Sequence, residues 1–402
     1  MIAAAGLPIY IHAPKFYVDE YGVSLVTLGV VLFGLRLLDV VQDPAFGWLA
    51  EKTRAHRRFG VTVAALVLAL SMIGLFAIPP LLPPLWWFAL TLTGLFSAFS
   101  FLTIAFYAQG VAKAATLPGG HLRLASWREA GALVGISLAA IAPTLLGYVI
   151  ARPFAGFALG FALFVLLASF AMRQQWTAAA TGADASPLTV LADPTARRFL
   201  ALALVNSAPV AVTATLFPFF VESRIGAANL SGPLLLLFFI TAALTAPLWG
   251  RIAAHFGQRN TLLAGMVLAI IAFAFALTLR TGDVLAFAAI SAASGAALAA
   301  DMVLLPALFA RQLAAHKGGE AMGFGLWSFA SKLTLAFAAL VLFPVLGAYG
   351  FTSGSANSAQ ALHALTLLYA GLPCALKLAA IALVVRTPMQ EEPRCSSESR
   401  PA

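Results

Sequence analysis

The sequence predicts an all-α membrane protein with about twelve transmembrane helices in two six-helix lobes. Three observations predict this class: the composition, the length of the apolar runs and the placement of the basic residues. Of the 402 residues, 61% are hydrophobic and only 10% are charged. A soluble chain of this length cannot bury so much apolar surface, because its size fixes the ratio of interior to surface. Apolar side chains must therefore face lipid, and the lipid bilayer is the first expected partner.

Apolar runs long enough to cross a membrane recur along the whole chain. A hydrocarbon core of roughly 30 Å needs about 20 apolar residues per helix. Only 13 residues precede Pro14, so we expect a first helix, within 1–18, that is shortened at its cytoplasmic end or starts upstream of Met1. Because the runs are continuous and do not alternate, a strand-based barrel is excluded. The further runs cover residues 23–49, 61–78, 85–111, 129–150, 154–172, 200–220, 232–250, 261–279, 284–308, 322–347 and 362–385.

The formal net charge is +9, but the basic residues lie in short loops between the apolar runs and form no single patch. Cytoplasmic loops of membrane proteins carry the excess of lysine and arginine. We therefore predict a multi-pass protein of a bacterial-type inner (plasma) membrane, with both termini cytoplasmic and with no nucleic-acid partner. On this topology the outer loops hold four basic residues: Lys15, Arg152, Arg224 and Arg280. The inner segments hold sixteen: Lys52, Arg54, Arg57, Arg58, Lys113, Arg123, Arg173, Arg197, Arg198, Arg251, Arg259, Arg311, Lys317, Arg386, Arg394 and Arg400.

The longest polar interval, residues 173–199, separates six predicted helices from six. Its Asp-Pro and Asp-Ala-Ser-Pro turn signals predict a cytoplasmic linker between lobes 1–172 and 200–385, with a cytoplasmic tail at 386–402. A faint repeat accompanies this division: Pro-Ala-Phe-Gly at 44–47 and Pro-Leu-Trp-Gly at 247–250 are expected to end the second and eighth helices. Parallel repeats of this kind build carriers that hold their substrate at the midplane between lobes.

Three ionisable residues in the second predicted helix share one face. Arg36, Asp39 and Asp43 are three and four residues apart, which aligns them along the helix. An ionisable group at the bilayer centre costs about 2.5–3.5 kcal/mol on insertion scales, so each needs a compensating role. Two carboxylates beside one arginine suit the binding of Na⁺, Li⁺ or H⁺. The structural alternative is an ion pair between Arg36 and one aspartate.

Other predicted helices carry single ionisable residues, and each has an expected role. Arg128, at the expected start of the fifth helix, either faces a cavity or pairs with the adjacent Glu129. Lys332, near the middle of the eleventh helix, is expected to face a cavity. Asp301 and Lys377 are expected to pair with each other. The charges assigned a structural or gating role are Arg36, Glu51, Arg54, Asp301 and Lys377.

Sequence motifs for other chemistry are absent. The chain carries no Gly-rich phosphate loop and no Gly-x-Ser-x-Gly or His-Glu-x-x-His pattern, and its six histidines show no metal spacing. Cys374 and Cys395 are too few for a disulfide framework. We therefore expect neither an enzyme nor an ATP-driven pump, and no cofactor. The energy would come from an ion gradient, with H⁺ or Na⁺ as the coupling ion.

The second predicted helix resembles a known transporter signature. Residues 36–48 (RLLDVVQDPAFGW), followed by the basic segment 52–60, are similar to the glycoside–pentoside–hexuronide:cation symporters. This melibiose permease-like family is a branch of the major facilitator superfamily. Looser similarity at residues 17–24, 127–131 and 331–332 extends the resemblance over essentially the whole chain. It implies the major facilitator fold and cation-coupled symport of a small polar, possibly glycoside-like solute by alternating access.

The resemblance also implies roles for individual residues. Asp39 and Asp43 would bind the coupling cation. Arg128 and Tyr107 would contact the solute, and Lys332, on the segment that starts at Trp327, would lie near the cation site. We group Arg128, Tyr107, Lys332 and Trp327 as substrate-binding candidates.

The sequence departs from the sugar-binding members at two positions. Those members carry an aspartate in the first helix and another in the fourth, whereas residues 1–13 contain no acid and Thr103 takes the second position. Carboxylates commonly accept hydrogen bonds from sugar hydroxyls, so the case for a sugar weakens. Fewer negative ligands also favour H⁺ over Na⁺.

Two other functions are compatible with the sequence. Relatives of this family move amphiphiles such as lysophospholipids, and a cavity lined by Phe106, Phe217, Phe219 and Phe220 would suit them. A non-transporting scaffold is disfavoured, because the loops hold no sizeable soluble domain and the paired aspartates would have no purpose. One chain with two lobes can form a complete pathway for a small-molecule substrate, so we expect a functional monomer.

Overall fold

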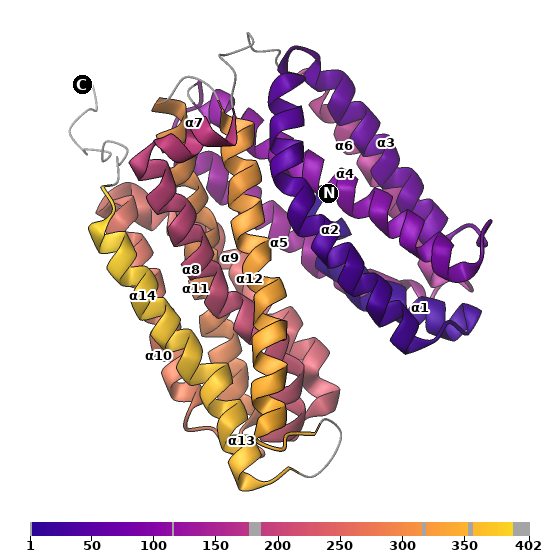
Figure 1. The fold of residues 1–402 in the computed structure, drawn as a ribbon, viewed down its shortest axis with the longest axis vertical. Coiled ribbons are helices and arrows are strands. Elements are labelled where there is room, and N and C mark those ends of the chain that lie inside the picture. The colour runs from indigo at the N-terminus through magenta and orange to yellow at the C-terminus, as the bar shows by residue number, and fades with distance from the viewer. Residues whose placement is uncertain (1, 115, 177–185, 316–318, 353–356, 389–402) are drawn as a thin grey trace. The chain divides into compact units, whose positions relative to one another are not determined.

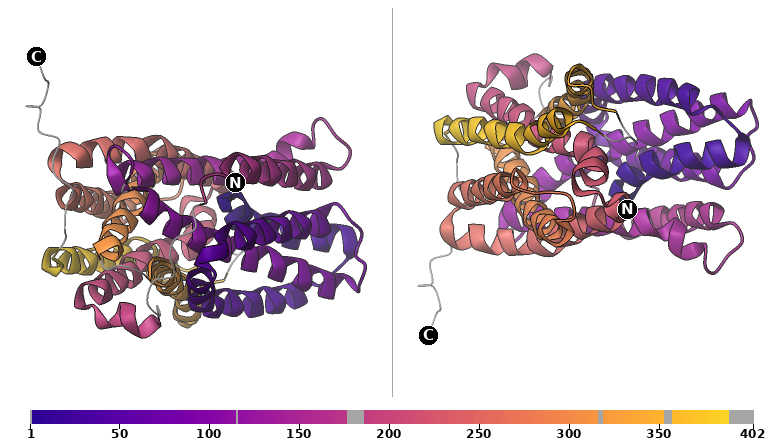
Figure 2. Two further views of the ribbon diagram at one scale, coloured as in Figure 1. Left: turned by 90° about the horizontal axis from the view of Figure 1, so that it is seen from above. Right: turned by 90° about the horizontal axis from the view of Figure 1, so that it is seen from below.

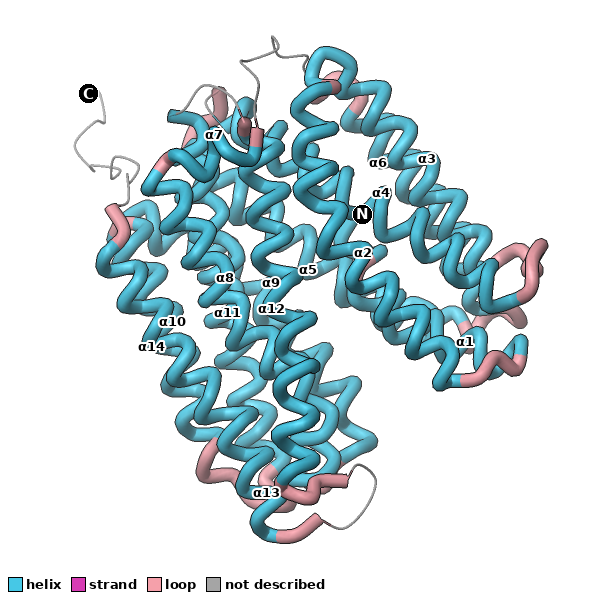
Figure 3. The backbone as a smooth tube through the Cα atoms, in the orientation of Figure 1, coloured by secondary structure: helices cyan, strands magenta, loops and turns pink. Residues whose placement is uncertain are grey.

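The computed structural model describes residues 2–114, 116–176, 186–315, 319–352 and 357–388, and helices are the regular elements drawn there (Figures 1 and 3). Two π-helical segments, η3 (Phe220–Ile225) and η5 (Leu367–Gly371), continue α8 and join α13 to α14. The short 3-10 turns are η1 (Ile2–Ala5), η2 (Arg54–His56) and η4 (Ala228–Leu230). The α-helices are α1 (Leu7–Tyr21), α2 (Leu25–Lys52), α3 (Arg57–Phe76), α4 (Pro84–Ala114), α5 (Gly120–Leu146), α6 (Pro153–Met172), α7 (Pro187–Ala192), α8 (Pro194–Phe219), α9 (Ser231–Phe256), α10 (Gln258–Ala276), α11 (Val284–Ala315), α12 (Glu320–Ala348), α13 (Ala359–Thr366) and α14 (Leu372–Arg386).

Ten helices within the described ranges are long and apolar enough to cross a membrane, compared with about twelve spans expected from the sequence. The two remaining predicted spans correspond to α1 and α2. α1 has only 15 residues, and α2 carries Arg36, Asp39 and Asp43 along its middle. The all-helical membrane class is therefore confirmed, while the number twelve stays a prediction.

Several helix ends differ from those predicted. α1 runs from Leu7 through Pro14 to Tyr21, whereas the first predicted helix lies within 1–18. α2 and α9 likewise run past the two repeat motifs to Lys52 and Phe256, although both motifs were expected to end their helices. Proline is tolerated inside membrane helices because neighbouring groups satisfy the freed backbone atoms. Apolar run length locates the hydrocarbon core, and helices extend beyond it into the polar interface.

Contacts divide the chain into two compact units. The first comprises residues 1–112, 132–191 and 316–329, and the second comprises 113–131, 192–315 and 330–402. Each unit thus includes a short segment from the other half of the sequence: the first takes the start of α12, and the second takes the start of α5. The predicted lobe boundary within 173–199 stays a prediction, since residues 177–185 lie outside the described residues, as do residues 389–402 of the predicted tail.

The core of the first unit is rich in aromatic side chains. Phe76 at the end of α3 stacks on Phe154 at the start of α6, with ring centroids 5.4 Å apart. These two helices pack side by side (Figure 1). Tyr17 of α1 is fully buried and packs edge-on against Phe88 of α4, with centroids 4.9 Å apart. Burial of such large rings stabilises the unit through apolar area and ring geometry.

The second unit is built on α8, α9, α10, α11 and α14. α8 begins with Asp193 as N-cap, whose carboxylate accepts a hydrogen bond from Thr195 N at 2.9 Å, and with Pro194 in its first turn. α8 and α14 lie against one another (Figures 1 and 2). Near their π-helical ends Phe220 stacks on Tyr369, with ring centroids only 4.1 Å apart.

The outward faces of these helices remain strongly apolar. Leu244 of α9 is 73% exposed, and Val41 of α2 is 69% exposed. Soluble proteins rarely expose large contiguous apolar surfaces. Lipid is the solvent that makes such surfaces stable, as the composition predicts.

The predicted topology can be tested with single cysteines in a variant whose Cys374 and Cys395 are replaced by serine. Arg280→Cys and Lys52→Cys place the thiol at exposed positions in a predicted outer and a predicted inner loop. Because basic residues concentrate on the cytoplasmic side, the cysteine at 280 should react with a membrane-impermeant maleimide in intact cells. The cysteine at 52 should react only after permeabilisation, and the reverse pattern would invert the topology.

Candidate functional site

The carboxylate of Asp39 lies in a polar network between α2 and α4. Asp39 is only 4% exposed. Its Oδ1 accepts hydrogen bonds from Ser100 Oγ at 3.0 Å and from Gln42 Nε2 at 3.3 Å. Ser97 Oγ in turn donates to Gln42 Oε1 at 2.8 Å. The network supplies the polar contacts that a buried carboxylate requires.

Asp43 is fully buried one turn after Asp39. At this turn α2 crosses the start of α12 at backbone contact distance. A Cβ built on Gly325 would lie 2.8 Å from the carbonyl oxygen of Asp43 and 3.0 Å from Gly47 Cα. The structure therefore places both predicted cation-binding residues in the interior of the first unit. A pairing of Arg36 with either aspartate stays a prediction.

α4 carries further polar residues after Ser100. Thr103, which lies three residues after Ser100, has a buried Oγ1 with no hydrogen-bond partner among the described residues. Tyr107 is half-buried, and its ring packs against Phe324 of α12 with centroids 5.0 Å apart. Trp327, also a predicted substrate-binding residue, is half-buried one turn after Phe324. Tyr107 and Trp327 thus lie on two helices that meet in the first unit.

Charged side chains hold the start of α12 to the end of α2. Arg54 Nη1 is 2.9 Å from Glu51 Oε1, and Arg54 Nη2 is 2.8 Å from Glu320 Oε2. Glu51 Oε2 also accepts a hydrogen bond from Ala321 N at 3.1 Å. A carboxylate at this position is stabilised by the positive N-terminal end of the α12 dipole. Glu51 and Arg54, predicted as structural or gating charges, are brought together here.

Arg57 was counted only as a topological charge in the loop, yet it is 4% exposed and begins α3. Its Nη1 donates to Gln109 Oε1 at 2.6 Å, and Gln109 Nε2 donates to Gln175 O at 2.8 Å. This arginine therefore ties α3 to α4 and to the segment after α6. Sequence spacing carried no signal for this contact, because its partners are far away along the chain.

The remaining charged candidates belong to the second unit. Arg128 lies inside α5, which begins at Gly120 and therefore about two turns before its predicted start. Arg128 Nε pairs with Glu129 Oε1 at 2.8 Å, and both side chains are largely buried. Of the two roles left open, the structure shows the pairing. A solute contact by Arg128 stays a prediction.

Lys377 and Asp301 form an ion pair, as expected from the sequence. Both are buried, and Lys377 Nζ also donates to Asn206 Oδ1 at 2.6 Å. This contact joins α14, α11 and α8. Lys332 is half-buried on α12, and its expected cavity position stays a prediction.

The phenylalanines suggested as a lining for amphiphiles have packing roles. Phe220 is fully buried against Tyr369. Phe217 packs on Phe287 with centroids 6.0 Å apart, and Phe219 packs on Phe343 at 5.8 Å. Phe106, in the other unit, packs on Trp176 at 6.4 Å. Each ring thus contacts another aromatic side chain within its unit, and a cavity lined by these phenylalanines stays a prediction.

The internal repeat places two glycines at equivalent helix crossings. A Cβ on Gly47 would lie 2.9 Å from Ala321 O of α12. A Cβ on Gly250 would lie 2.9 Å from the Cβ of Ser126 in α5. Small residues at membrane helix crossings allow such close approach. The glycine of each repeat motif therefore allows close packing of a helix from the other half of the sequence: α12 against Gly47 and α5 against Gly250.

Comparisons with known proteins agree with a transporter fold. The profile of the family described as MFS/sugar transport protein matches residues 1–391. No curated protein sequence is detectably similar to the chain. Among solved structures, a bacterial homologue of the iron transporter ferroportin in its outward-facing state matches with 14% identity and a TM-score of 0.71, and 96% of each chain is covered.

Two further solved structures share this fold. The E. coli fucose:proton symporter matches with 12% identity and a TM-score of 0.64, over 94% of this chain and 95% of that chain. The human organic anion transporter MFSD10 matches with 17% identity and a TM-score of 0.66, over 94% of this chain and 91% of that chain. At these identities the likeness shows the fold, and it leaves the substrate open.

The crossing of α2 with α12 can be tested by adding one methyl group. Gly47→Ala should destabilise the protein by about 1–3 kcal/mol, because the new Cβ meets backbone atoms that have little freedom to move. Thermal unfolding in detergent measures the effect.

Gly34→Ala on the same helix is the matched control. Among the described residues, no atom outside the adjoining turns of its own helix lies within 4 Å of a Cβ built on Gly34. This change should therefore be neutral or stabilising by up to about 1 kcal/mol. Equal unfolding temperatures for the two variants would show that the α2–α12 crossing is not tightly packed.

Proposed function

From the premise that this chain belongs to the MFS/sugar transport protein family, we propose that it carries a small polar solute in symport with a cation. Secondary transport itself follows from the family and the fold. We further propose that the cation couples to transport by binding Asp39 and Asp43. Within the superfamily we propose the glycoside–pentoside–hexuronide:cation symporters as the nearest group, because residues 36–48 resemble their second-helix signature.

The observation that carries this proposal is the burial of two carboxylates one turn apart in a membrane helix. Asp39 and Asp43 are 4% and 0% exposed. Such residues are costly in an apolar environment and are commonly retained for ion or proton pathways. Ser100 and Gln42 donate hydrogen bonds to the Asp39 carboxylate and stabilise it in the protein interior.

We propose H⁺ as the coupling ion, with Na⁺ as the competing outcome of the test. Two nearby carboxylates in a low-dielectric site repel each other when both are ionised, and binding of one proton relieves that repulsion. Na⁺ would need several more oxygen ligands. The acids that sugar-binding family members carry in the first and fourth helices have no counterpart within residues 1–13 or at Thr103, which also favours H⁺.

The solute is proposed to contact Tyr107 and Trp327. These amphipathic aromatic side chains lie on α4 and α12, the helices that adjoin the Asp39 network and the Gly47 crossing. Aromatic faces pack well against the C–H faces of a sugar-like ring, while the phenol and indole N–H serve as polar partners. Arg128 and Lys332 remain further candidates on the family resemblance alone.

Asp43→Asn tests cation coupling without knowledge of the solute. A cation that binds only the folded state stabilises it by RT ln(1 + [L]/Kd), about 2.7 kcal/mol at a hundredfold excess over Kd. If H⁺ is the ligand, the unfolding temperature of detergent-purified wild type should rise as the pH falls, and Asp43→Asn should lose that rise. A Na⁺-specific rise that the variant loses would assign Na⁺ instead.

The control is Asp19→Asn, which removes an exposed carboxylate paired with Lys15. This variant should keep the ion and pH response of the wild type. If Asp43→Asn and the wild type respond alike to pH, Na⁺ and Li⁺, the symport proposal fails.

Alternating access is proposed to require release of the start of α12 from the end of α2. The Arg54–Glu320 pair opposes that release. Glu320→Gln should therefore increase amide hydrogen exchange in the first turns of α12, because opening becomes easier. Asp19→Asn should leave exchange there unchanged. Unaltered exchange in Glu320→Gln would show that this ion pair does not hold α12 in place.

A further inference from the structure

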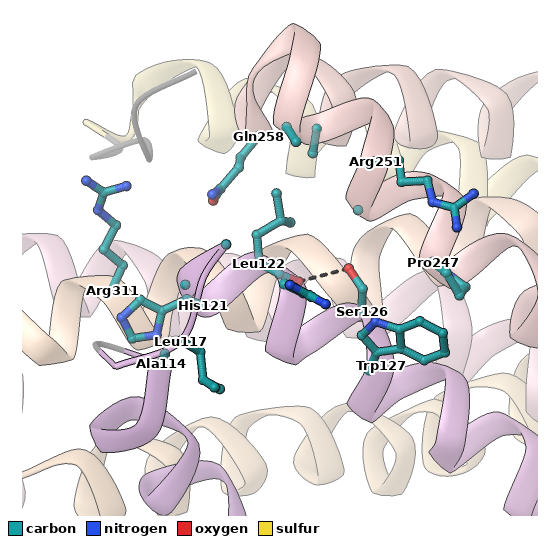
Figure 4. A pocket seen from close by; sticks show the side chains of 16 residues that line it. Ala114, Leu117, His121, Leu122, Ser126, Trp127, Pro247, Arg251, Gln258 and Arg311 are labelled. Carbon is teal, nitrogen blue, oxygen red and sulfur yellow. Dashed lines mark hydrogen bonds between the residues drawn. The ribbon is translucent and has the colours of Figure 1, made fainter. Parts of the chain in front are cut away.

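A pocket of about 780 Å³ lies in the second unit where several helices approach one another (Figure 4). Its lining comes from the last residue of α4 and the loop after it, the start of α5, the end of α9, the start of α10 and the end of α11. In the predicted topology all of these helix ends face the cytoplasm. The residues proposed for cation and solute binding are not among those that line it.

The described lining residues give this pocket a positive charge. Arg123, Arg251 and Arg311 contribute the guanidinium groups that carry this charge, and His121 also lines the pocket. None of the described lining residues is acidic. α5 and α10 also begin here, and the free N–H groups and dipole of a helix start favour anions. The pocket therefore has the chemistry of an anion site.

Membrane orientation alone would place arginines in cytoplasmic loops, but it does not explain two buried polar atoms in this pocket. Gln258 is 3% exposed, and its amide group points into the pocket (Figure 4). Its Oε1 has no hydrogen-bond partner in the described part of the chain, and the same is true of Arg311 Nη1. Buried polar atoms in folded proteins are normally paired, so these two atoms indicate a ligand.

The equivalent helix crossing in the first unit, at Gly47, has a carboxylate that the Gly250 crossing beside this pocket lacks at the corresponding position. There, Glu51 lies four residues after Gly47. It accepts a hydrogen bond from the backbone N–H of Ala321, which lies in the first turn of α12. Four residues after Gly250 the chain has Ala254, which lines the pocket. The start of α12 thus receives a carboxylate from its own chain, whereas the start of α5 faces arginines and an alanine.

We propose that this pocket binds a phosphate group. Arginine forks and helix N–H groups match the anionic oxygens of phosphate. Gln258 Oε1 needs a donor, which the P–OH of hydrogen phosphate or a headgroup hydroxyl supplies and an ionised carboxylate lacks. Bound there, the group joins α5 to α9, α10 and α11. The proposal does not depend on the cation coupling proposed above.

The test is thermal unfolding of the full-length protein, purified in an uncharged detergent, during titration with sodium phosphate. Sodium chloride at matched ionic strength separates specific binding from screening. We expect saturable stabilisation by phosphate and none by chloride. Arg311→Gln should weaken the apparent phosphate affinity at least tenfold, while Arg280→Gln, an exposed arginine of the same unit outside the pocket, should not change it.

A second titration distinguishes the source of the phosphate. Dihexanoyl phosphatidylglycerol is compared with dihexanoyl phosphatidylcholine, whose headgroup lacks net charge and hydroxyls. Stabilisation by inorganic phosphate assigns a soluble ligand, and stabilisation by phosphatidylglycerol alone assigns a lipid headgroup; both support the site provided that Arg311→Gln weakens them. If Arg311→Gln does not fold, Arg251→Gln replaces it. Equal effects of phosphate and chloride with no effect of phosphatidylglycerol, or equal affinities in wild type and pocket variants, would overturn the proposal.

Discussion

The structure depends on the need to satisfy ionisable groups that are buried in membrane helices. Asp39 meets this need through Ser100 and Gln42, and thereby fixes α2 against α4. Lys377 meets it through Asp301 and Asn206, and fixes α14 against α11 and α8. In lipid an unpaired charge is costly, so each group constrains the helices around it. Each network thus joins helices that are far apart in the sequence.

Close helix crossings are the second constraint, and they make the charge clusters possible. Gly47 lets the backbone of α12 approach α2, and this approach brings Glu320 to Arg54. Gly250 gives α5 the same access to α9. The sequence repeat around these glycines therefore corresponds to a repeated structural feature, a close helix crossing. Its two copies differ in charge: carboxylates occupy the crossing at α12, while arginines surround the start of α5.

The sequence predicted what depends on local pattern. Continuous apolar runs located the helices, and spacing placed Asp39 and Asp43 on one face of α2. Helix ends were less predictable, as at the end of α1 and at the start of α5, because membrane helices extend past their apolar core. Contacts distant in sequence, such as Arg57 with Gln109, left no local signal.

Charge movement on solid-supported membranes tests the central claim, that buried carboxylates of α2 bind the coupling cation. Proteoliposomes are given a rapid pH jump or Na⁺ jump without solute, and the transient current is recorded for wild type and Asp39→Asn. The amide can still accept hydrogen bonds but cannot ionise. We predict a transient current in the wild type, on the pH jump for H⁺ coupling, that is lost in the variant. Currents of equal size in both proteins would show that cation binding lies elsewhere.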